Sequence, residues 1–306
     1  MEVSQENVQE QAPEIVVSVV IVSRNCAAAL RGCLAALEKS TIRESMEIVV
    51  ADNASHDGSE RIDHEFPAVA PLRMQHHIGL TRARNIALRT AKGEFLLLLS
   101  PDVIVAPDTV AKLVERARND SSALAVCPIL ADPVGKPASR AYRLPDAAAV
   151  AAAWADPASL PAAPLGDYIE LHDGKALLIR RNSVQGMNYL DEKFGEHWSD
   201  VELAFQVRRA GKKIALDSSI RATLDTQPLW KPSTTGERSA YAADAASGAA
   251  AYIGKRSGFA ASLAFRVKLI FGALVRVLTF QDSGFNSGLL MGLLNGSKID
   301  GTDKSL

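Results

Sequence analysis

Three acidic residues stand where an expected strand or helix meets a turn, and each could do chemistry there. Asp52 closes an apolar run, Asp102 follows the continuous apolar run 95–99, and Asp200 opens a helical pattern with Glu202 nearby. Ligands of parallel sheets gather where the strands end. Carboxylates at such positions can accept hydrogen bonds, hold a cation or take a proton from a hydroxyl group. We therefore expect the three carboxylates to converge at one rim of a sheet.

A basic residue and an amide stand beside these acids in the expected arrangement. Arg84 and Asn85 lie at the start of a helical pattern. In a crevice at the strand ends, Asp52 could accept from a ribose hydroxyl or a base N–H, while Arg84 could neutralise phosphate. Asp102 could then hold a divalent cation that bridges a diphosphate, and Asp200 could deprotonate an incoming hydroxyl. The set predicts a site for a nucleotide diphosphate.

Each of these residues also has a purely structural explanation. The segment 52–59 could be a capped turn, and Asp102 could belong to a Ser-Pro-Asp turn that starts a helix. Arg84 could be an exposed helix charge, and Asp200 could simply suit the positive end of a helix dipole. His197 is a lone histidine beside a tryptophan, and such histidines are usually structural or solvent-facing. These alternatives stay open at the level of sequence.

Apolar runs alternate with helical patterns along the first two thirds of the chain. The runs are rich in β-branched residues or lack polar alternation, as in strands buried on both faces of a sheet. Alternating strands and helices imply right-handed βαβ units and a mostly parallel sheet. A segment rich in Ala and Pro, 145–164, predicts an irregular excursion. The expected strands are 15–23, 46–51, 94–99, 175–181 and 213–216. The expected helices are 81–92, 107–114, 199–210 and 240–251, together with a helical pattern through Leu30, Leu34 and Leu37.

The composition bounds the class of protein. The chain has 306 residues, a hydrophobic content of 47% and a formal net charge of -1. This favours a globular protein and argues against a nucleic-acid-binding surface. Three cysteines are too few for a disulfide framework or a zinc site. Residues 1–14 lack the basic start and apolar stretch of a secretory signal, so we expect a disordered tail there and a cytoplasmic location.

Five segments, in this order and spacing, resemble the inverting family 2 glycosyltransferases of GT-A fold, in particular a rhamnosyltransferase-like branch. The likeness extends over about two thirds of the chain. The resemblance implies an α/β fold with a Rossmann-like, mostly parallel sheet flanked by helices, here followed by a C-terminal helical extension. It divides the chain into a GT-A domain at 15–230 and the extension at 231–306. The five segments are 17–25, 49–59, 79–88, 96–103 and 191–211.

The resemblance also assigns roles to residues. It implies a nucleotide-diphosphate sugar donor bound by polar side chains. It also implies an acceptor hydroxyl on a glycan or a lipid-linked glycan. Asp102 matches the family's metal-binding acid, with Mg²⁺ or Mn²⁺ expected, and Asp200 matches the general base. The expected transfer is of a hexosyl or deoxyhexosyl group with inversion, as in polysaccharide biosynthesis at the cell envelope. The expected donor-binding residues are Ser23, Asn25, Asp52, Arg84 and Asn85.

Departures from the family pattern leave two other functions open. Ser199 stands where family members usually have Glu, and 222–228 lacks the His that often lies near the metal. Asp225 could replace that His as an oxygen ligand. One alternative is a catalytically silent GT-A-like binding or scaffold protein. The other is a nucleotidyltransferase, which should show a Gly-rich phosphate loop near the first strand that this chain lacks.

The C-terminal part has a signal of its own. With six Lys or Arg against one acid, residues 254–298 carry a local charge of +5. At about 100° per residue, nine large apolar side chains of 259–280 fall in an arc of roughly 160°, and Arg266, Lys268 and Arg276 lie outside it. This pattern predicts a basic amphipathic helix at the inner face of the cytoplasmic membrane, with 289–294 as a second apolar contact. Packing of the same arc against the catalytic domain or a second subunit is the alternative. The arc comprises Phe259, Leu263, Val267, Ile270, Phe271, Leu274, Val275, Val277 and Leu278.

Overall fold

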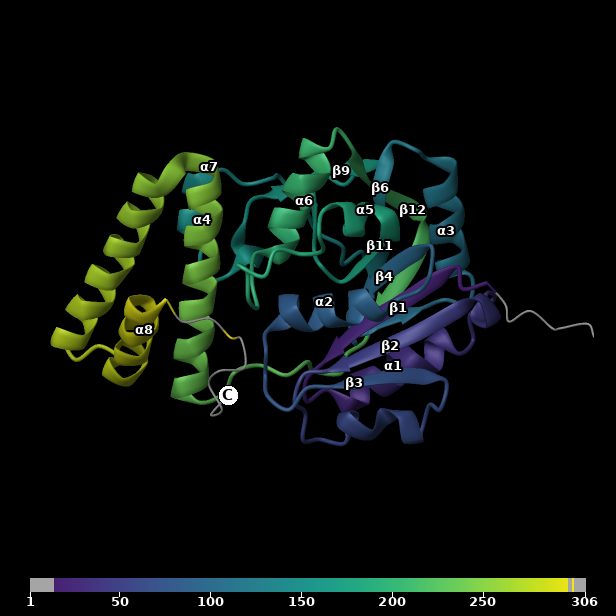
Figure 1. The fold of residues 1–306 in the computed structure, drawn as a ribbon, viewed down its shortest axis with the longest axis horizontal. Coiled ribbons are helices and arrows are strands. Elements are labelled where there is room, and N and C mark those ends of the chain that lie inside the picture. The colour runs from purple at the N-terminus through teal and green to yellow at the C-terminus, as the bar shows by residue number, and fades with distance from the viewer. Residues whose placement is uncertain (1–13, 297–298, 300–306) are drawn as a thin grey trace, which may run out of the picture.

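The computed structural model describes residues 14–296 and residue 299, so the predicted disordered tail lies outside the described residues except for Glu14. Helices and strands alternate through most of the chain (Figure 1). The strands are β1 Val17–Ser23, β2 Met46–Asp52, β3 Val69–Arg73, β4 Phe95–Leu99, β5 Val103–Val105, β6 Ala123–Ala131, β7 Ala141–Tyr142, β8 Ala162–Ala163, β9 Tyr168–Ile169, β10 Leu171–His172, β11 Ala176–Arg180 and β12 Lys213–Leu224. The helices are α1 Ala27–Leu37, α2 Leu80–Thr90, α3 Thr109–Asn119, α4 Ala147–Ala152, α5 Arg181–Gly186, α6 Ser199–Arg209, α7 Thr235–Leu278 and α8 Ser283–Asn295.

One large twisted sheet forms the centre of the molecule. Its strand order is β3-β2-β1-β4-β11-β6-β12-β5, with β9 pairing on β12. The strands β3, β2, β1 and β4 are parallel, as the alternation of strands and helices predicts. β11 runs antiparallel to β4 and to β6, so the sheet is mixed beyond its N-terminal half. The carboxyl ends of β1, β2 and β4 therefore share one edge.

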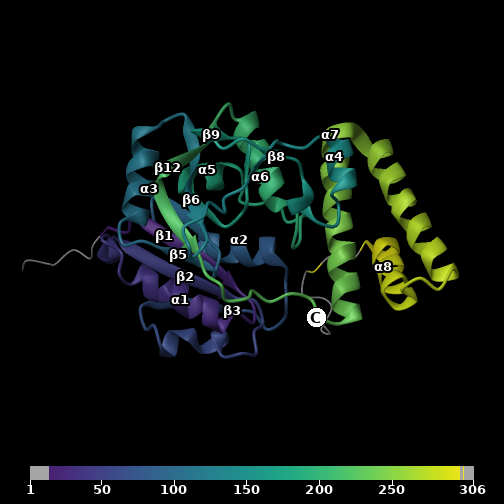
Figure 2. The same cartoon turned by 180° about the vertical axis from the view of Figure 1, so that it is seen from behind.

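The sheet is buried on both faces, which explains why its strands lack polar alternation. One face packs on α1 and α3, with Leu30, Leu34 and Val110 among the buried side chains. The other face packs on α2, α6 and the first part of α7, where Leu88 and Val201 are buried. Figures 1 and 2 show the sheet between these helical layers. The predicted α/β fold with flanking helices is confirmed.

Two strands depart from the sequence prediction. β6 is buried at all nine positions, yet it is not among the expected strands, because Ala, Cys and Pro give it no β-branched signature. β12 continues to Leu224 rather than ending at 216, with an irregularity between Asp217 and Arg221. The polar residues at that irregularity hide the second half of the strand. Both strands lie in the half of the sheet that carries the antiparallel pairings.

The C-terminal extension is a helical hairpin. α7 begins at a capping box formed by Thr234 and Glu237 and changes direction at Gly258, whose φ is 85°. The segment before Gly258, called here the inner arm, packs on the α/β domain, and Tyr252 donates a hydrogen bond to the Pro145 carbonyl. The segment 259–278, called here the outer arm, runs back beside it with α8 (Figure 1). Small residues of both arms pack on Leu289 and Leu293 of α8.

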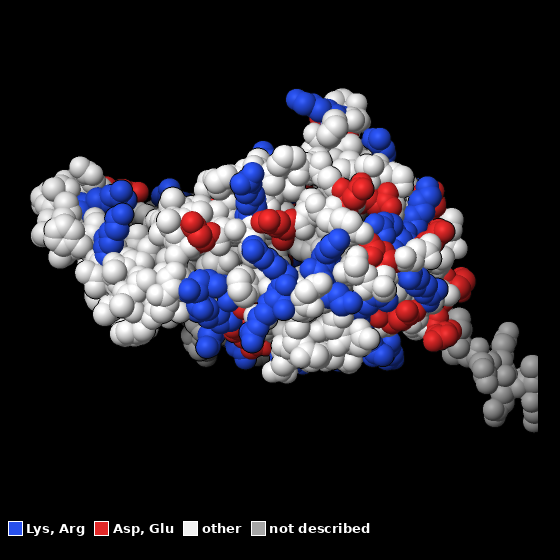
Figure 3. Space-filling model, turned by 90° about the horizontal axis from the view of Figure 1, so that it is seen from above, with Lys and Arg blue, Asp and Glu red and all other residues white. Residues whose placement is uncertain are grey.

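The apolar arc of the outer arm faces away from the protein. Seven of its nine side chains are exposed, with Phe259 at 79% and Phe271 at 66%, while Ile270 and Val277 are half-buried. The outer arm instead buries Phe265 and Ala273 on its other side. Figure 3 shows that this end of the molecule is largely free of charged side chains apart from a few basic ones. The alternative that the arc packs against the catalytic domain is therefore wrong.

Candidate functional site

A cleft of about 300 Å³ opens at the carboxyl ends of β1, β2 and β4. This is the edge at which parallel sheets bind ligands. Loops and helix starts from both halves of the domain contribute its walls, so its lining is far apart in sequence. Three cationic side chains face it, which suits a phosphorylated ligand. Its polar and aromatic lining includes Arg24, Asn53, Arg84, Lys175, Asp200 and Trp230.

A smaller cavity of about 170 Å³ adjoins the cleft. The two share Asp173, Glu196 and Asp200 as lining residues. The smaller cavity is otherwise lined by aromatic and apolar side chains, among them Tyr142 and Trp198. Asp200 thus stands in the wall between a cation-rich cleft and an aromatic cavity. A carboxylate in that place can contact a ligand on either side.

Asp200 does not stand alone in that wall. Arg84 Nη1 donates to Asp200 Oδ1 at 2.7 Å, and both side chains are largely buried. Gly174 makes the approach possible: its φ is 77°, and a Cβ at that position would lie 2.7 Å from Asp200 Oδ2. The sequence motifs contain Arg84 and Asp200 but say nothing of Gly174. Arg84, which is predicted to bind phosphate, and Asp200, which is predicted to act as the base, are therefore hydrogen-bonded to each other in the ligand-free protein.

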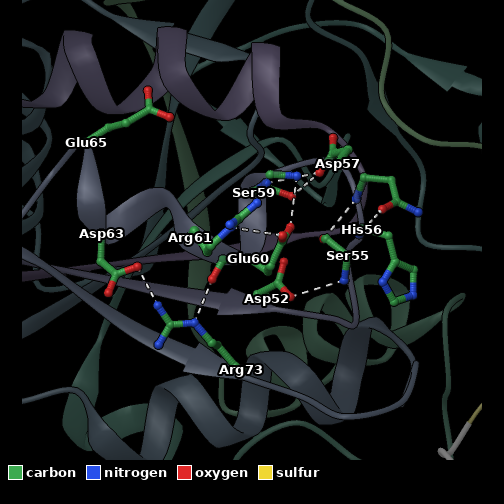
Figure 4. Close-up of polar contacts among 12 residues, drawn as sticks. Asp52, Ser55, His56, Asp57, Ser59, Glu60, Arg61, Asp63, Glu65 and Arg73 are labelled. Carbon is green, nitrogen blue, oxygen red and sulfur yellow. Dashed lines mark hydrogen bonds and ion pairs between the residues drawn. The ribbon is translucent and has the colours of Figure 1, made fainter.

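Asp52 lies behind the cleft rather than in its lining, and its neighbour Asn53 reaches the wall. Asp52 Oδ2 accepts from the Ser55 backbone N–H at 3.1 Å, as Figure 4 shows. Oδ1 is buried without a hydrogen-bond partner. Burial raises the pKa of the Asp52 carboxyl, although the Ser55 hydrogen bonds act in the opposite direction. An unpaired acceptor in this position suits a ligand N–H or O–H.

Ser23 and Asn25 tie the ends of β1 and β2 together. The Asn25 backbone N–H donates to Ser55 Oγ at 3.0 Å, and Asn25 Oδ1 accepts from the His56 N–H at 2.7 Å. Asn25 has a φ of 43°, a left-handed conformation that Asn tolerates. The Ser23 hydroxyl is buried against Cys26 Sγ at 3.3 Å. Neither Ser23 nor Asn25 lines the cleft, so both hold the loops that do.

Asn85 has a different position from the one predicted. It is fully buried, and its amide exchanges hydrogen bonds with the Leu190 backbone at 2.8 and 3.0 Å. The same amide nitrogen donates to Glu192 at 2.9 Å. Asn85 does not line the cleft. Both ends of its side chain are committed to the loop before α6, so we assign it to positioning that loop and not to the donor.

The predicted metal acid is paired with a lysine. Lys175 Nζ donates to Asp102 Oδ2, and Ser100 Oγ donates to Asp102 Oδ1 at 2.5 Å. Asp225 joins Asp102 only through the backbone, by an N–H···O bond of 2.7 Å, and its carboxylate is turned towards Gly32 on α1. Over 14–296 and 299, no three His, Cys, Asp or Glu side chains converge in a way that could hold a metal ion. These residues do not fit the predicted metal site.

The three acids therefore do not converge as expected. Asp200 lines the cleft, Asp102 lies behind the Lys175 ammonium, and Asp52 is buried one residue from the wall. Several cleft residues lie outside the predicted set, among them Arg24 and Trp230. The Arg24 guanidinium stacks on the Trp230 ring, 4.5 Å from its centroid. Trp230 belongs to the loop before α7, where no sequence motif marks it. Arg24 lies inside a family segment, and only its position in the fold distinguishes it.

His197 lines the smaller cavity and belongs to a cluster that joins α7 to the catalytic domain. Its Nδ1 lies 3.7 Å from Asp244 Oδ2, which is an electrostatic contact and too long for a hydrogen bond. Burial alone would lower the pKa of His197, but Asp244 and Glu196 outweigh it and the net shift is upward. The stacked rings of His77 and Tyr241 lie beside it. His197 therefore has a structural role here, together with a place in the cavity wall.

Comparison with known proteins agrees with this geometry. Residues 18–162 match the model of glycosyl transferase family 2. An uncharacterized glycosyltransferase of Bacillus subtilis, YfnE, is 35% identical over 113 residues, which cover 36% of this chain and 29% of that protein. The chain thus matches less than a third of this relative's length. Residues 18–162 therefore make up a domain of the family 2 glycosyltransferases.

Solved structures show the same fold. GalNAc-T7 with UDP, GalNAc and Mn2+ superposes with a TM-score of 0.58 at 19% identity, covering 74% of this chain and 47% of that one. The mannosyltransferase PcManGT from Pyrobaculum calidifontis, in complex with GDP-Man and Mn2+, has a TM-score of 0.53 at 17% identity and covers 94% and 89%. The fold is GT-A. Both neighbours were solved with a divalent cation and a nucleotide.

Proposed function

We propose that the protein transfers a sugar from a nucleotide-diphosphate donor in the cleft to a hydroxyl group presented from the smaller cavity. The observation that carries this proposal is the position of Asp200, which lines both. A base must contact the acceptor hydroxyl while the anomeric carbon of the donor lies next to it. The wall between two adjoining cavities is the place where one carboxylate can meet that requirement.

The proposed reaction is a single displacement. The Asp200 carboxylate takes the proton of the acceptor hydroxyl, whose oxygen forms a bond to the anomeric carbon. The bond from that carbon to the diphosphate oxygen breaks on the opposite face, which inverts the configuration. Arg84 has two tasks: it holds the Asp200 carboxylate in position before the donor binds, and it offers its other guanidinium nitrogens to the diphosphate. The unpaired Asp52 oxygen is the proposed acceptor for the base or ribose.

The predicted Mg²⁺ or Mn²⁺ has no step in this reaction. A divalent ion at Asp102 would lie beside the Lys175 ammonium, which already uses one carboxylate oxygen, and the repulsion between the two cations opposes binding of the ion. The cations that support the proposed reaction are side chains of the chain itself. The effect of added Mg²⁺ or Mn²⁺ on the transfer rate is therefore measured separately from the transfer itself.

The proposed acceptor is a lipid-linked glycan, reached from the inner face of the cytoplasmic membrane. Support comes from the outer arm, whose exposed arc is entirely apolar and is bordered by Arg266 and Lys268. The outer arm carries Arg266, Lys268 and Arg276 and no acidic residue, which suits anionic headgroups. Lys255 and Arg256 belong to the inner arm and pair with Glu202. A bilayer with anionic lipids offers both an apolar interior for the arc and negative headgroups for the basic residues beside it. On this proposal 15–230 is the catalytic domain and 231–306 is its membrane-bound extension.

The outer arm is proposed to lie on the membrane and not to cross it. α7 is the helix, among those in the described residues, that is long and apolar enough to span a bilayer. Its kink at Gly258 leaves only the outer arm free, since the inner arm packs on the catalytic domain. Crossing would place Arg266 and Lys268 near the bilayer centre, at a cost of about 2.5–3.5 kcal/mol each. In the headgroup region both cations reach water and phosphate.

A screen of nucleotide sugars tests the enzymatic proposal. Purified protein is incubated with uridine, guanosine and thymidine diphosphate sugars and a lipid-linked glycan, and released nucleotide and glycosylated product are measured by mass spectrometry. We expect one hexosyl or deoxyhexosyl donor to be consumed, with inverted anomeric configuration in the product by NMR. Binding of a nucleotide sugar without hydrolysis or transfer would instead support a catalytically silent GT-A protein.

A further inference from the structure

Three basic side chains line the donor cleft, but only Lys175 occupies the position next to the family's metal acid. Lys175 Nζ donates to Asp102 Oδ2. The Lys175 side chain is 31% exposed and that of Asp102 only 11%, so the ammonium lies on the cleft side of the carboxylate. Arg84 reaches the same cleft from α2, where it pairs with Asp200.

The backbone fixes Lys175 in this place. The Ser100 N–H donates to the Lys175 carbonyl at 2.7 Å, and the Lys175 N–H donates to Asp173 Oδ1 at 3.2 Å. Lys175 directly precedes β11, whose first residue pairs with Leu99 at the end of β4. The lysine and the turn that carries Asp102 are therefore held on adjacent strands. A side chain anchored in this way is preorganised for a ligand in the cleft.

We infer that Lys175 is the cation that neutralises the leaving diphosphate in this protein, in the place where a divalent metal would bind. The inference rests on the proposed function, because it needs a diphosphate in the cleft. The ammonium is already bound to Asp102 and needs only to extend one of its three N–H groups to a phosphate oxygen. A divalent metal at Asp102 and the Lys175 ammonium would share one carboxylate, so their mutual repulsion opposes binding of the metal while the ammonium is in place.

The test compares wild-type protein with Lys175→Met in the full chain. Binding of uridine, guanosine and thymidine diphosphates is measured by calorimetry in EDTA and then in Mn²⁺. The wild type is expected to bind one of them with a Kd that changes less than about threefold between the two conditions. Lys175→Met should bind it about tenfold more weakly in EDTA and regain affinity in Mn²⁺, because Asp102 is then free. Free Mn²⁺ monitored by electron paramagnetic resonance should fall with the variant and not with the wild type.

Two further variants keep the test decisive. Lys175→Arg retains the charge and should bind nucleotide in EDTA within about threefold of wild type, which separates charge from folding. Lys112→Met removes a surface lysine of α3 that pairs with Asp108 at 2.6 Å and does not line the cleft, and it should change nothing. A wild type that binds nucleotide only with Mn²⁺, with Lys175→Met unaffected, overturns the inference and leaves the proposed function standing. A wild type that binds no nucleotide under either condition removes the donor site and the inference together.

Discussion

The Arg84 guanidinium lies 2.7 Å from the Asp200 carboxylate, across a separation of 116 residues. Arg84 lies within α2, which follows β3, and Asp200 lies in the first turn of α6, which follows β11 and α5. The pair joins the phosphate-binding side of the cleft to the proposed base. The first prediction concerns this pair.

Replacing Arg84 by Met should weaken donor binding by about tenfold, because a charge-assisted contact to the diphosphate is lost. Turnover should fall further, since Asp200 loses the partner that orients it. The measurement is calorimetric nucleotide binding together with initial rates. Arg89→Met is the matched control, because Arg89 lies on the same helix in an exposed pair with Glu192. Equal losses in both variants would show that the effect belongs to α2 and not to the cleft.

Replacing Asp52 by Asn should stabilise the ligand-free protein while weakening nucleotide binding. Burial raises the pKa of Asp52, so its ionisation opposes folding above that pKa. Relief of a buried charge with one unpaired oxygen is worth on the order of 1 kcal/mol. The gain over wild type should shrink as pH falls through the folded pKa, which thermal unfolding at several pH values would measure. Nucleotide binding that survives the substitution would contradict the role given to Asp52.

Asp57 lies in the same turn and provides a control, because its pKa is shifted in the opposite direction to that of Asp52. Burial alone would raise its pKa, but hydrogen bonds from Ala27 and Ser59 outweigh it and the pKa is lowered. A lowered carboxyl pKa contributes stability above the unfolded value of about 3.9, and this contribution is lost as pH falls through the folded value. Asp57→Asn should therefore destabilise the protein at neutral pH. A shift in the same direction as Asp52→Asn would mean that burial does not distinguish the two carboxyls.

The contact between His197 and Asp244 predicts a pH dependence of stability. Because the folded pKa of His197 is raised, its contribution is fully present below the unfolded value of about 6.5 and is lost as pH rises through the folded value. Denaturant unfolding should show a falling free energy across that interval. His197→Gln should flatten this part of the profile. An unchanged slope in the variant would assign the dependence to other groups.

The outer arm should bind bilayers that contain anionic lipid. Val267 is 55% exposed at the centre of the apolar arc, and Val267→Asp should abolish co-flotation with vesicles of phosphatidylcholine and phosphatidylglycerol. Lys268→Glu should reduce the preference for phosphatidylglycerol, worth about 1 kcal/mol per basic residue. Val134→Asp is the control, since Val134 is 89% exposed on a distant turn. Loss of flotation in the control, or none in Val267→Asp, would count against a membrane surface.

The sequence predicts best what depends on buried apolar runs. β4 is continuously apolar, and β1 and β2 are apolar apart from a few polar residues, so their existence, their parallel pairing and the edge at which they end follow from pattern alone. β6 and the second half of β12 have weaker signatures and are defined only by their neighbours in the sheet. The outer arm is only partly predictable. Its amphipathic pattern is clear from the sequence, but the side that faces outward depends on packing against α8 and the inner arm.

The candidate site is less predictable because its main contacts join side chains from different helices, strands and loops. Motifs identify Asp102 and Asp200, but the pairing of Asp102 with Lys175 depends on the register of β11 against β4. Asn85 stands in a family segment, yet its amide is consumed by the Leu190 backbone. Trp230 lies in a Pro-containing loop without any pattern. Residue type and spacing thus predict the edge of the sheet that carries the site but not the partners of each side chain.

The most direct test of the account is Asp200→Asn, with donor binding and turnover measured on the same preparation. Removal of a general base costs about 10²–10⁴ in rate. We predict that the variant binds the preferred nucleotide sugar within about threefold of wild type, and that transfer to the acceptor falls by about a thousandfold, within the range expected for a lost base. Transfer that continues at the wild-type rate would contradict the assignment of Asp200 and, with it, the two-cavity arrangement of donor and acceptor.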